Sequence, residues 1–193
     1  NKSKHAAPVM AHIKALYDYG LDLLKQGKWE TPGLLKLTDK KTNKEYHIHY
    51  LVNHKFELGT MYIGNTIVVY VVDEQHNWLF DNADGFLTIG FKYGSDKMRN
   101  EVKRYLPSIK KTFYAADNRM CMIINKTPDL LLLRDVLNFF KGQIPARHVA
   151  WIQSTLHNLL CYFEYAEITH NDISPDTYFI SPLHHSGALL GGW

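Results

Sequence analysis

The sequence predicts an α+β fold in which a strand-rich half precedes a helical half. Between residues 46 and 124, apolar positions alternate with polar ones or gather in short β-branched and aromatic runs, as strands require. Residues 146–165 instead repeat their apolar positions with helical spacing. The 193 residues are 46% hydrophobic and 13% aromatic, enough to bury a sizeable core. This composition excludes a disordered or collagen-like chain.

The first half is expected to begin with a helix and a polar segment. Pro8 suits the first turn of a helix over residues 8–27, and Gly27 can end that helix. Residues 36–44 (KLTDKKTNK) are basic and typical of a solvated turn, and residues 82–85 (NADG) indicate another turn. Strands are predicted over residues 46–52, 60–72, 86–91, 112–116 and 120–124, and a helix over residues 95–106.

The second half is predicted to hold two helices and then two short strands. The first helix covers residues 132–140 and ends near Gly142, and the second covers residues 146–165 with Pro145 at its start. The strands follow over residues 178–180 and 187–190. Because only three residues follow the last strand, we expect the chain to be a piece of a longer polypeptide.

Charge, apolar runs and cysteines narrow the partners and the compartment. The net charge is +3, too small by itself to favour a nucleic-acid partner. No apolar run approaches the ~20 residues of a membrane span, so we expect no membrane partner. Cys121 and Cys161 have neither metal-ligand spacing nor a disulfide pattern, which favours a reducing compartment such as the cytoplasm.

The segment His170–Ile180 (HNDISPDTYFI) resembles the catalytic loop of protein kinases, His-Arg-Asp-x-x-x-x-Asn followed by a hydrophobic strand. Phe56–Gly64 (FELGTMYIG) is similar to the end of a kinase glycine-rich loop and the strand after it. Thr88–Lys92 (TIGFK) would be the strand with the phosphate-contacting lysine, and Arg119–Thr127 the strand and hinge that hold the adenine.

The resemblance covers residues 46–193 and is greatest to divergent kinase-like domains of microbes and phages, some of them attached to J-domain chaperones. It implies an antiparallel-sheet N-lobe over residues 46–126 and a truncated helical C-lobe over residues 127–193. An N-terminal helix and a basic linker, residues 1–45, would precede them. The implied compartment is the cytoplasm of a bacterium or of a phage-infected host.

The same resemblance implies the residues of a phosphoryl-transfer site. ATP, Mg²⁺ and a Ser/Thr hydroxyl of a protein substrate would be the reactants. Asp172 would be the base, and Lys92 would contact the phosphates while Glu101 pairs with it. The residues implied to contact the nucleotide or the metal are Gly59, Lys92, Ile124, Asn125, Asp176 and Thr177, the last two as metal ligands.

Three departures from the kinase pattern favour a weakly active or inactive pseudokinase. Thr177 stands where kinases have a metal-binding Asn, and Gly192 stands where they have the metal-binding Asp, although Mg²⁺ requires oxygen ligands. Residues 53–64 also contain only two glycines, which leaves few places for a close approach to phosphate. The alternative function is a non-catalytic interaction module, or a structural component, of a larger phage or bacterial protein.

Several of these residues also have a purely structural interpretation. The Asp172 side chain would then only accept bonds from loop amides, and Lys92 would be a solvated lysine at a strand end. We expect His170 to pack and to bond neighbouring backbone. His47, His49 and His54 lack the companion ligands of a zinc site.

Overall fold

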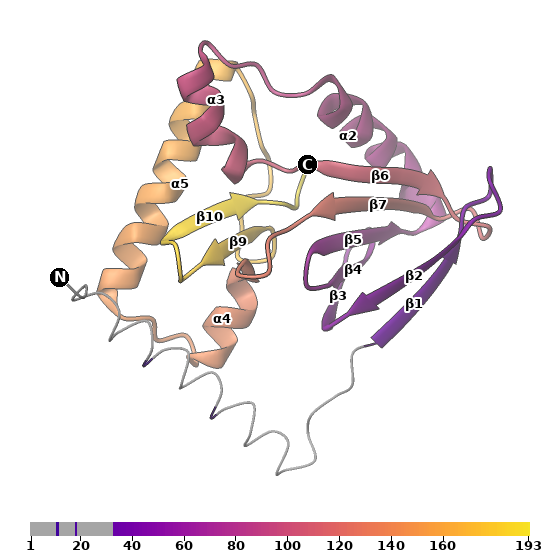
Figure 1. The fold of residues 1–193 in the computed structure, drawn as a ribbon, viewed down its shortest axis with the longest axis horizontal. Coiled ribbons are helices and arrows are strands. Elements are labelled where there is room, and N and C mark those ends of the chain that lie inside the picture. The colour runs from indigo at the N-terminus through magenta and orange to yellow at the C-terminus, as the bar shows by residue number, and fades with distance from the viewer. Residues whose placement is uncertain (1–10, 12–17, 19–32) are drawn as a thin grey trace. The chain divides into compact units, whose positions relative to one another are not determined.

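The computed structural model describes residues 11, 18 and 33–193 (Figure 1). The chain divides into two units, residues 1–33 and 34–193. Apart from residues 11 and 18, the helix predicted over residues 8–27 lies outside the described residues. The elements described below therefore belong to the second unit, apart from the first residue of the first strand.

A five-stranded antiparallel sheet is the largest element of this unit. Its strands lie in the order β3-β4-β5-β7-β6, so β5, the third of these five strands along the chain, is central. The bounds are β3 Val52–Phe56, β4 Gly59–Ile63, β5 Ile67–Val72, β6 Ile109–Tyr114 and β7 Met120–Asn125. The unbroken apolar run of β5 fits a strand that is buried on both faces.

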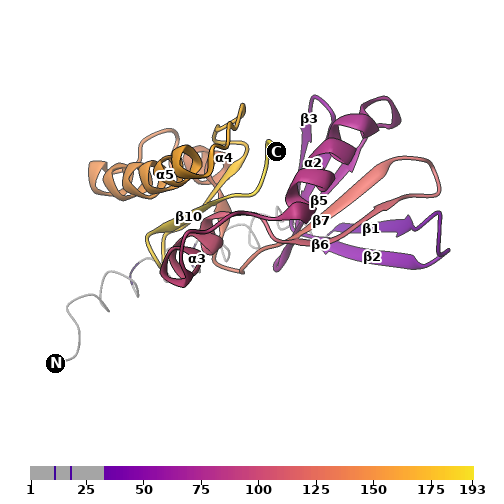
Figure 2. The same ribbon diagram turned by 90° about the horizontal axis from the view of Figure 1, so that it is seen from above.

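Different elements cover the two faces of this sheet. Val69 and Val71 of β5 face the two-stranded sheet of β1 (Gly33–Thr38) and β2 (Glu45–Tyr50) in one buried cluster. Val68 and Tyr70 cluster instead with buried residues of α2 (Asn77–Ile89). Figure 2 shows α2 and the β1–β2 pair on opposite sides of the sheet. Strand β1, from the segment predicted as a basic linker, thus forms part of a covering layer together with β2, the strand predicted over residues 46–52.

Helix α2 corrects one sequence prediction, because the strand expected over residues 86–91 does not form. Ala83 and Leu87 are buried one helical turn apart against the sheet, and this packing stabilises a helix through a sequence with strand and turn character. Gly85, expected in a turn, lies within the helix, where a β-carbon would meet no atom within 4 Å.

The turn between β1 and β2 is held by a buried carboxylate. Oδ1 of Asp39 accepts the N–H groups of Lys41 and Thr42 at 2.9 and 3.2 Å, and Oδ2 accepts the Lys111 ammonium at 3.0 Å. The bond from Lys111 is the main reason that the pKa of Asp39 falls from 3.8 to about 2. The bridge ties the turn to β6.

This carboxylate predicts an acid dependence of stability. Because folding lowers its pKa, ionised Asp39 stabilises the folded state above pH 3.8, and that contribution is lost as the pH falls toward about 2. In urea unfolding, Asp39→Asn is expected to cost most near neutral pH and progressively less as the solution is acidified. A difference between the two proteins that stays constant down to about pH 2 would contradict this assignment.

The remaining elements form a second layer around a three-stranded sheet of order β10-β9-β8. The helices predicted over residues 132–140 and 146–165 are confirmed as α4 and α5, and the two short strands as β9 and β10. The bounds are α3 Asp96–Val102, β8 Leu131–Leu132, α4 Leu133–Phe139, α5 Ala146–Ala166, β9 Tyr178–Ser181 and β10 Ser186–Leu189. Two short 3₁₀ turns, Glu74–His76 and Lys103–Tyr105, complete the unit.

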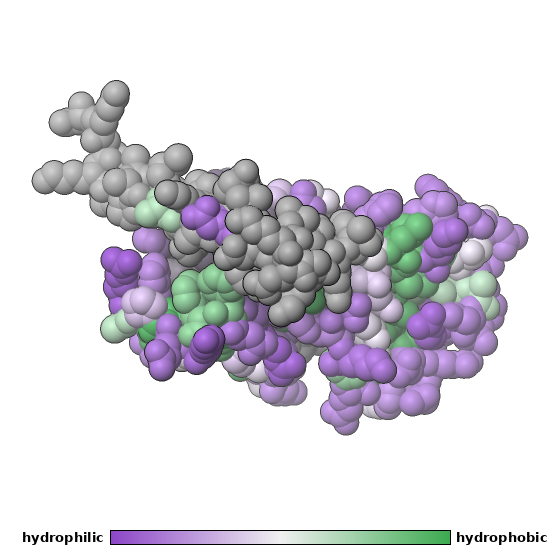
Figure 3. Space-filling model, turned by 90° about the horizontal axis from the view of Figure 1, so that it is seen from below, coloured by the Kyte–Doolittle hydropathy of each residue, from purple (hydrophilic) through white to green (hydrophobic). Residues whose placement is uncertain are grey.

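One buried cluster joins the five-stranded sheet to β8 and β9. It contains Val68 and Ile124 from the sheet together with Leu132 and Phe179 from the second layer, all at most 1% exposed. The two layers therefore share a continuous apolar core. On the face shown in Figure 3, the coloured residues are mainly hydrophilic with small hydrophobic areas. In the described part of the chain, no helix has the length and apolar character needed to cross a bilayer.

Candidate functional site

A cavity of about 1100 Å³ lies between the two layers. The β3–β4 hairpin and α2 form one wall, and the loop of residues 167–177 forms the other. Arg134 at the start of α4 and the last two residues, Gly192 and Trp193, complete the lining. Two of the kinase-like motifs identified in the sequence, Phe56–Gly64 and the loop beginning at His170, therefore meet at this cavity.

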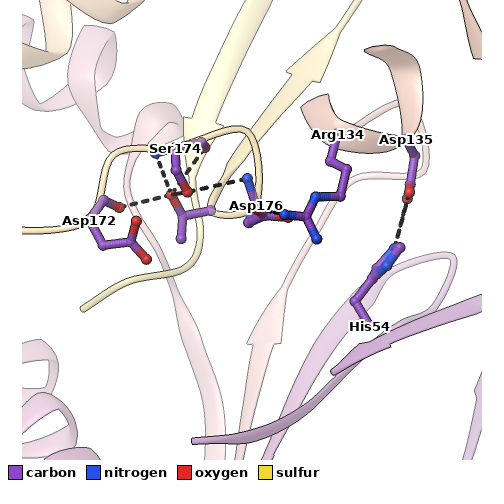
Figure 4. Close-up of polar contacts among 7 residues, drawn as sticks. His54, Arg134, Asp135, Asp172, Ser174 and Asp176 are labelled. Atoms are coloured by element: carbon purple, nitrogen blue, oxygen red, sulfur yellow. Dashed lines mark hydrogen bonds and ion pairs between the residues drawn. The ribbon is translucent and has the colours of Figure 1, made fainter. Parts of the chain in front are cut away.

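The loop that carries Asp172 is closed by its own hydrogen bonds. The Thr177 hydroxyl donates to the Asp172 carbonyl at 2.8 Å and accepts the Ser174 N–H at 3.0 Å (Figure 4). Thr177 is buried at the cavity lining, and its hydroxyl is engaged in the bonds that close the loop. Asp172 itself is exposed and lines the cavity.

His170 has the structural role expected of it. Its ring stacks on Phe163 at 6.1 Å and meets Trp193 edge to face at 4.5 Å. Nδ1 accepts the Asp172 N–H at 3.3 Å, and Nε2 lies 3.2 Å from the Gly191 carbonyl. Burial lowers the pKa of His170, which favours the neutral ring.

Two consecutive residues of α4 join both walls of the cavity. Arg134 pairs with Asp176 of the loop, and its own N–H donates to the Pro175 carbonyl at 2.9 Å. Asp135 lies 3.1 Å from Nε2 of His54, which comes from β3 (Figure 4). The helix thus fixes the hairpin and the loop relative to each other. Asp176, implied as a metal ligand, is committed to Arg134.

The His54–Asp135 bond predicts a measurable coupling between the walls. Because both side chains are partly buried, a double-mutant cycle with His54→Ala and Asp135→Ala should give about 0.5–1 kcal/mol in urea unfolding. The matched cycle on Asp96 and Arg99, an exposed pair at 3.9 Å, should give a coupling near zero. Equal couplings in the two cycles would contradict the proposed link.

The strand and the helix that carry the Lys–Glu pair in kinases bring an aromatic pair to this cavity. Kinases carry that lysine on the third strand of the sheet and the glutamate on the next helix. Here β5 (IVVYVV) contains no lysine and α2 (NWLFDNADGFLTI) no glutamate. Instead, Tyr70 of β5 and Phe80 of α2 face each other at 5.9 Å and line the cavity.

Tyr70 is fixed and uncharged. Its hydroxyl donates to the Leu190 carbonyl at 3.3 Å, and its ring also meets Phe56 at 5.8 Å. Burial, with a smaller contribution from the Asp172 charge, raises the pKa of the phenol. A neutral tyrosine cannot replace the cation that contacts phosphate in kinases.

Lys92 and Glu101, the residues implied for that pair, lie elsewhere. The strand expected to carry Lys92 is absent, since α2 continues to residue 89 and Lys92 follows it in an irregular segment. Its carbonyl accepts the Tyr162 hydroxyl at 2.8 Å, and its side chain is exposed. Glu101 is exposed on α3. Neither residue lines the cavity, so the structure does not bring them together with Asp172.

Gly192 leaves no room for the missing metal ligand. Its φ is +75°, and a β-carbon there would lie 2.6 Å from the Asp172 carbonyl oxygen and 2.9 Å from the His170 ring. Both neighbours are held in the hydrogen-bonded loop. Position 192 therefore lacks the aspartate of kinases, and its backbone geometry also leaves no space for one.

The residues implied to contact the nucleotide are occupied otherwise. A β-carbon at Gly59 would lie 2.2 Å from the Val71 carbonyl, so this glycine serves strand packing after a two-residue turn. Ile124 is buried in the core shared by both layers. The Asn125 amide bonds Ser108, and neither Ile124 nor Asn125 lines the cavity.

ATP and Mg²⁺ therefore do not fit the residues present. The Lys126 N–H at the end of the sheet donates to the Thr66 carbonyl at 2.9 Å, so it is not free for a purine. Apolar side chains fill the space between the sheet and β9. Among the described residues, no group of three or more His, Cys, Asp or Glu side chains could hold a metal ion.

Sequence reasoning missed the residues that define the cavity. Tyr70 carries one available signal, since it is the single polar-tipped residue in an otherwise aliphatic strand. Arg134 and His54 carry none, because their partners lie 42 and 81 residues away and only the fold brings them together.

Comparison with known proteins shows the fold. A structure described as vaccinia related kinase 3 matches with a TM-score of 0.60 at 15% identity, over 84% of this chain and 51% of that one. A crystal structure of WbdD matches with a TM-score of 0.54 at 15% identity, over 76% of this chain and 33% of that one. A complex of WbdD with the kinase inhibitor LY294002 matches with a TM-score of 0.52.

These matches cover only parts of the known structures. The chain spans about half of the vaccinia related kinase 3 structure and about a third of WbdD. No protein-family model and no curated protein matches the sequence. At these identities the likeness concerns the backbone and the order of elements. The chain has a divergent protein kinase-like fold, as the loop after the long helix predicted.

Proposed function

We propose that this chain is a non-catalytic kinase-like domain that acts as an interaction module. The observation that carries the proposal is Tyr70, a neutral side chain bonded to the Leu190 carbonyl, on the strand whose place in the sheet is that of the lysine-bearing strand of kinases. Phosphoryl transfer depends on cations at the phosphates and on carboxylates at the metal. Of the residues implied for this chemistry, Asp172, Asp176 and Thr177 line the cavity, whereas Lys92 and Glu101 do not.

The cations that do line the cavity do not replace the missing lysine. Arg134 is paired with Asp176. Lys55 is exposed on β3, and among the described residues no carboxylate pairs with it to hold it over the loop.

Both free cysteines, buried Cys121 and exposed Cys161, support our further proposal of a reducing, cytoplasmic compartment.

A phosphoryl-transfer assay tests the proposal. The chain is incubated with labelled ATP, Mg²⁺ and a mixed library of Ser/Thr peptides, beside the Asp172→Asn variant and an unrelated active kinase. We expect label transfer by the active kinase only, and equal backgrounds for the two forms of this chain. Transfer that the wild-type chain supports and Asp172→Asn abolishes would overturn the proposal.

A further inference from the structure

We propose that the cavity binds an arginine side chain presented by a partner protein. This inference rests on the proposed function, because it concerns the same cavity once a nucleotide is excluded. The partner would present a basic segment to this cavity, whereas a kinase binds an anionic nucleotide at the corresponding place.

The charge of the lining favours a cation. The Arg134–Asp176 pair is neutral as a unit. His170 is favoured in its neutral form because it is buried. In the described part of the chain, the other charged lining residues with Lys, Asp or Glu side chains are Lys55, Glu57, Glu167 and Asp172. Three carboxylates and one ammonium group thus belong to the lining, and this excess of negative charge disfavours a phosphate.

Asp172 is the carboxylate best placed to receive the cation. The loop bonds engage its backbone N–H and carbonyl, at 3.3 and 2.8 Å, and the carboxylate has no hydrogen-bond or ion-pair partner among the described residues (Figure 4). Tyr70, which lines the same cavity, donates its hydroxyl proton to the Leu190 carbonyl. The backbone of Asp172 is thus fixed while its charge stays available.

Aromatic rings line the same cavity as this carboxylate. Trp193 follows Gly192, and a β-carbon placed on Gly192 would lie 3.0 Å from the β-carbon of Asp172. The Trp193 ring stacks with Phe86 at 6.0 Å and an interplanar angle of 17°. Phe86 is 42% exposed and lines the cavity. A planar cation can therefore lie on a ring while it donates to the carboxylate.

These two features together favour arginine over lysine. The guanidinium group is planar, stacks on aromatic faces and donates two parallel bonds to one carboxylate. A lysine ammonium is a compact, strongly hydrated charge and gains less from a ring. The cavity is also large enough to admit a side chain together with part of its backbone.

The probe is a short fluorescent Gly/Ser peptide that contains arginines, compared with the same peptide containing citrulline, its neutral isostere. Fluorescence anisotropy is expected to show binding of the arginine peptide at least about tenfold tighter than that of the citrulline peptide. Asp172→Asn and Phe86→Ala are each expected to weaken binding by about threefold to tenfold.

Glu101→Gln is the matched control, because it removes one negative charge at an exposed position outside the cavity. It should bind as the wild type does. Equal binding of the two peptides, or equal losses in Asp172→Asn and Glu101→Gln, would overturn the inference. A circular dichroism melt of each variant separates a lost contact from a lost fold.

The outcome remains separable from that of the proposed function. Label transfer from ATP would overturn the proposed function whatever the peptides do. Absence of both transfer and arginine discrimination would overturn the arginine site alone.

Discussion

Gly192→Asp is expected to destabilise the domain by about 2–5 kcal/mol and to create no Mg²⁺ site. The substitution restores the residue type that binds the metal in kinases. Its β-carbon, however, would lie 2.6 Å from the Asp172 carbonyl oxygen in a backbone with φ of +75°. Left-handed strain and a clash with fixed backbone then add. Urea unfolding with and without Mg²⁺ measures both expectations.

Gly142→Asp is the matched control for this substitution. Gly142 has a φ of +76°, and a β-carbon there would meet nothing within 4 Å. Its replacement carries the backbone strain without the clash, about 1–2 kcal/mol. Equal losses of stability in the two variants would show that position 192 has room for a side chain. Stabilisation of Gly192→Asp by Mg²⁺ would contradict the account of the site.

Phe179→Ala is expected to cost about 3–5 kcal/mol of unfolding free energy. Phe179 is fully buried in the cluster that joins the sheet to the second layer. Its removal leaves a void lined by side chains of both layers, which are too well packed to collapse onto it. The loss should appear in the urea midpoint with little change in the slope.

The control for this substitution is Phe139→Ala on α4. Phe139 is 40% exposed, so the same change of residue type should cost only about 1 kcal/mol. Similar costs at the two positions would contradict the view that one core holds both layers together. In that case the apolar packing between the sheet and β9, which leaves no space for a purine, would not be essential to the fold.

Local patterns predicted much of the second half of the fold. Residues 146–165 carry a helical apolar face long enough to outweigh any alternative, and the structure has that helix with one further residue. The loop beginning at His170 could be identified because its residue types recur at fixed spacing. The short strand predicted over residues 178–180 also forms, as β9, with one further residue.

Helix α2 shows where local patterns fail. Residues 86–91, of which the helix contains the first four, include aromatic and β-branched types that favour a strand, and NADG favours a turn. The burial of Ala83 and Leu87 against the sheet decides for the helix, and a packing partner cannot be read from a local window. Because of this error, the sequence predicts the lysine-bearing strand over residues 88–92, whereas β5 occupies that place in the sheet.

The candidate site depended even more on long-range contacts. The motif located Asp172 and Thr177, but the hydroxyl of Thr177 proved to close the loop. Tyr70 is held by the carbonyl of Leu190, which lies 120 residues further along the chain. Sequence spacing gives no access to such pairs until the strand order is known.

Thermal melting with ATP, in the presence and absence of Mg²⁺, tests the central claim most directly. A ligand at about 100 times its dissociation constant stabilises a native state by about 2.7 kcal/mol, which a melt resolves. The account predicts an unchanged midpoint at saturating ATP under both conditions. A rise in the midpoint that depends on Mg²⁺, and persists in Asp172→Asn, would contradict it by showing that a nucleotide enters the space now assigned to Phe179 and its neighbours.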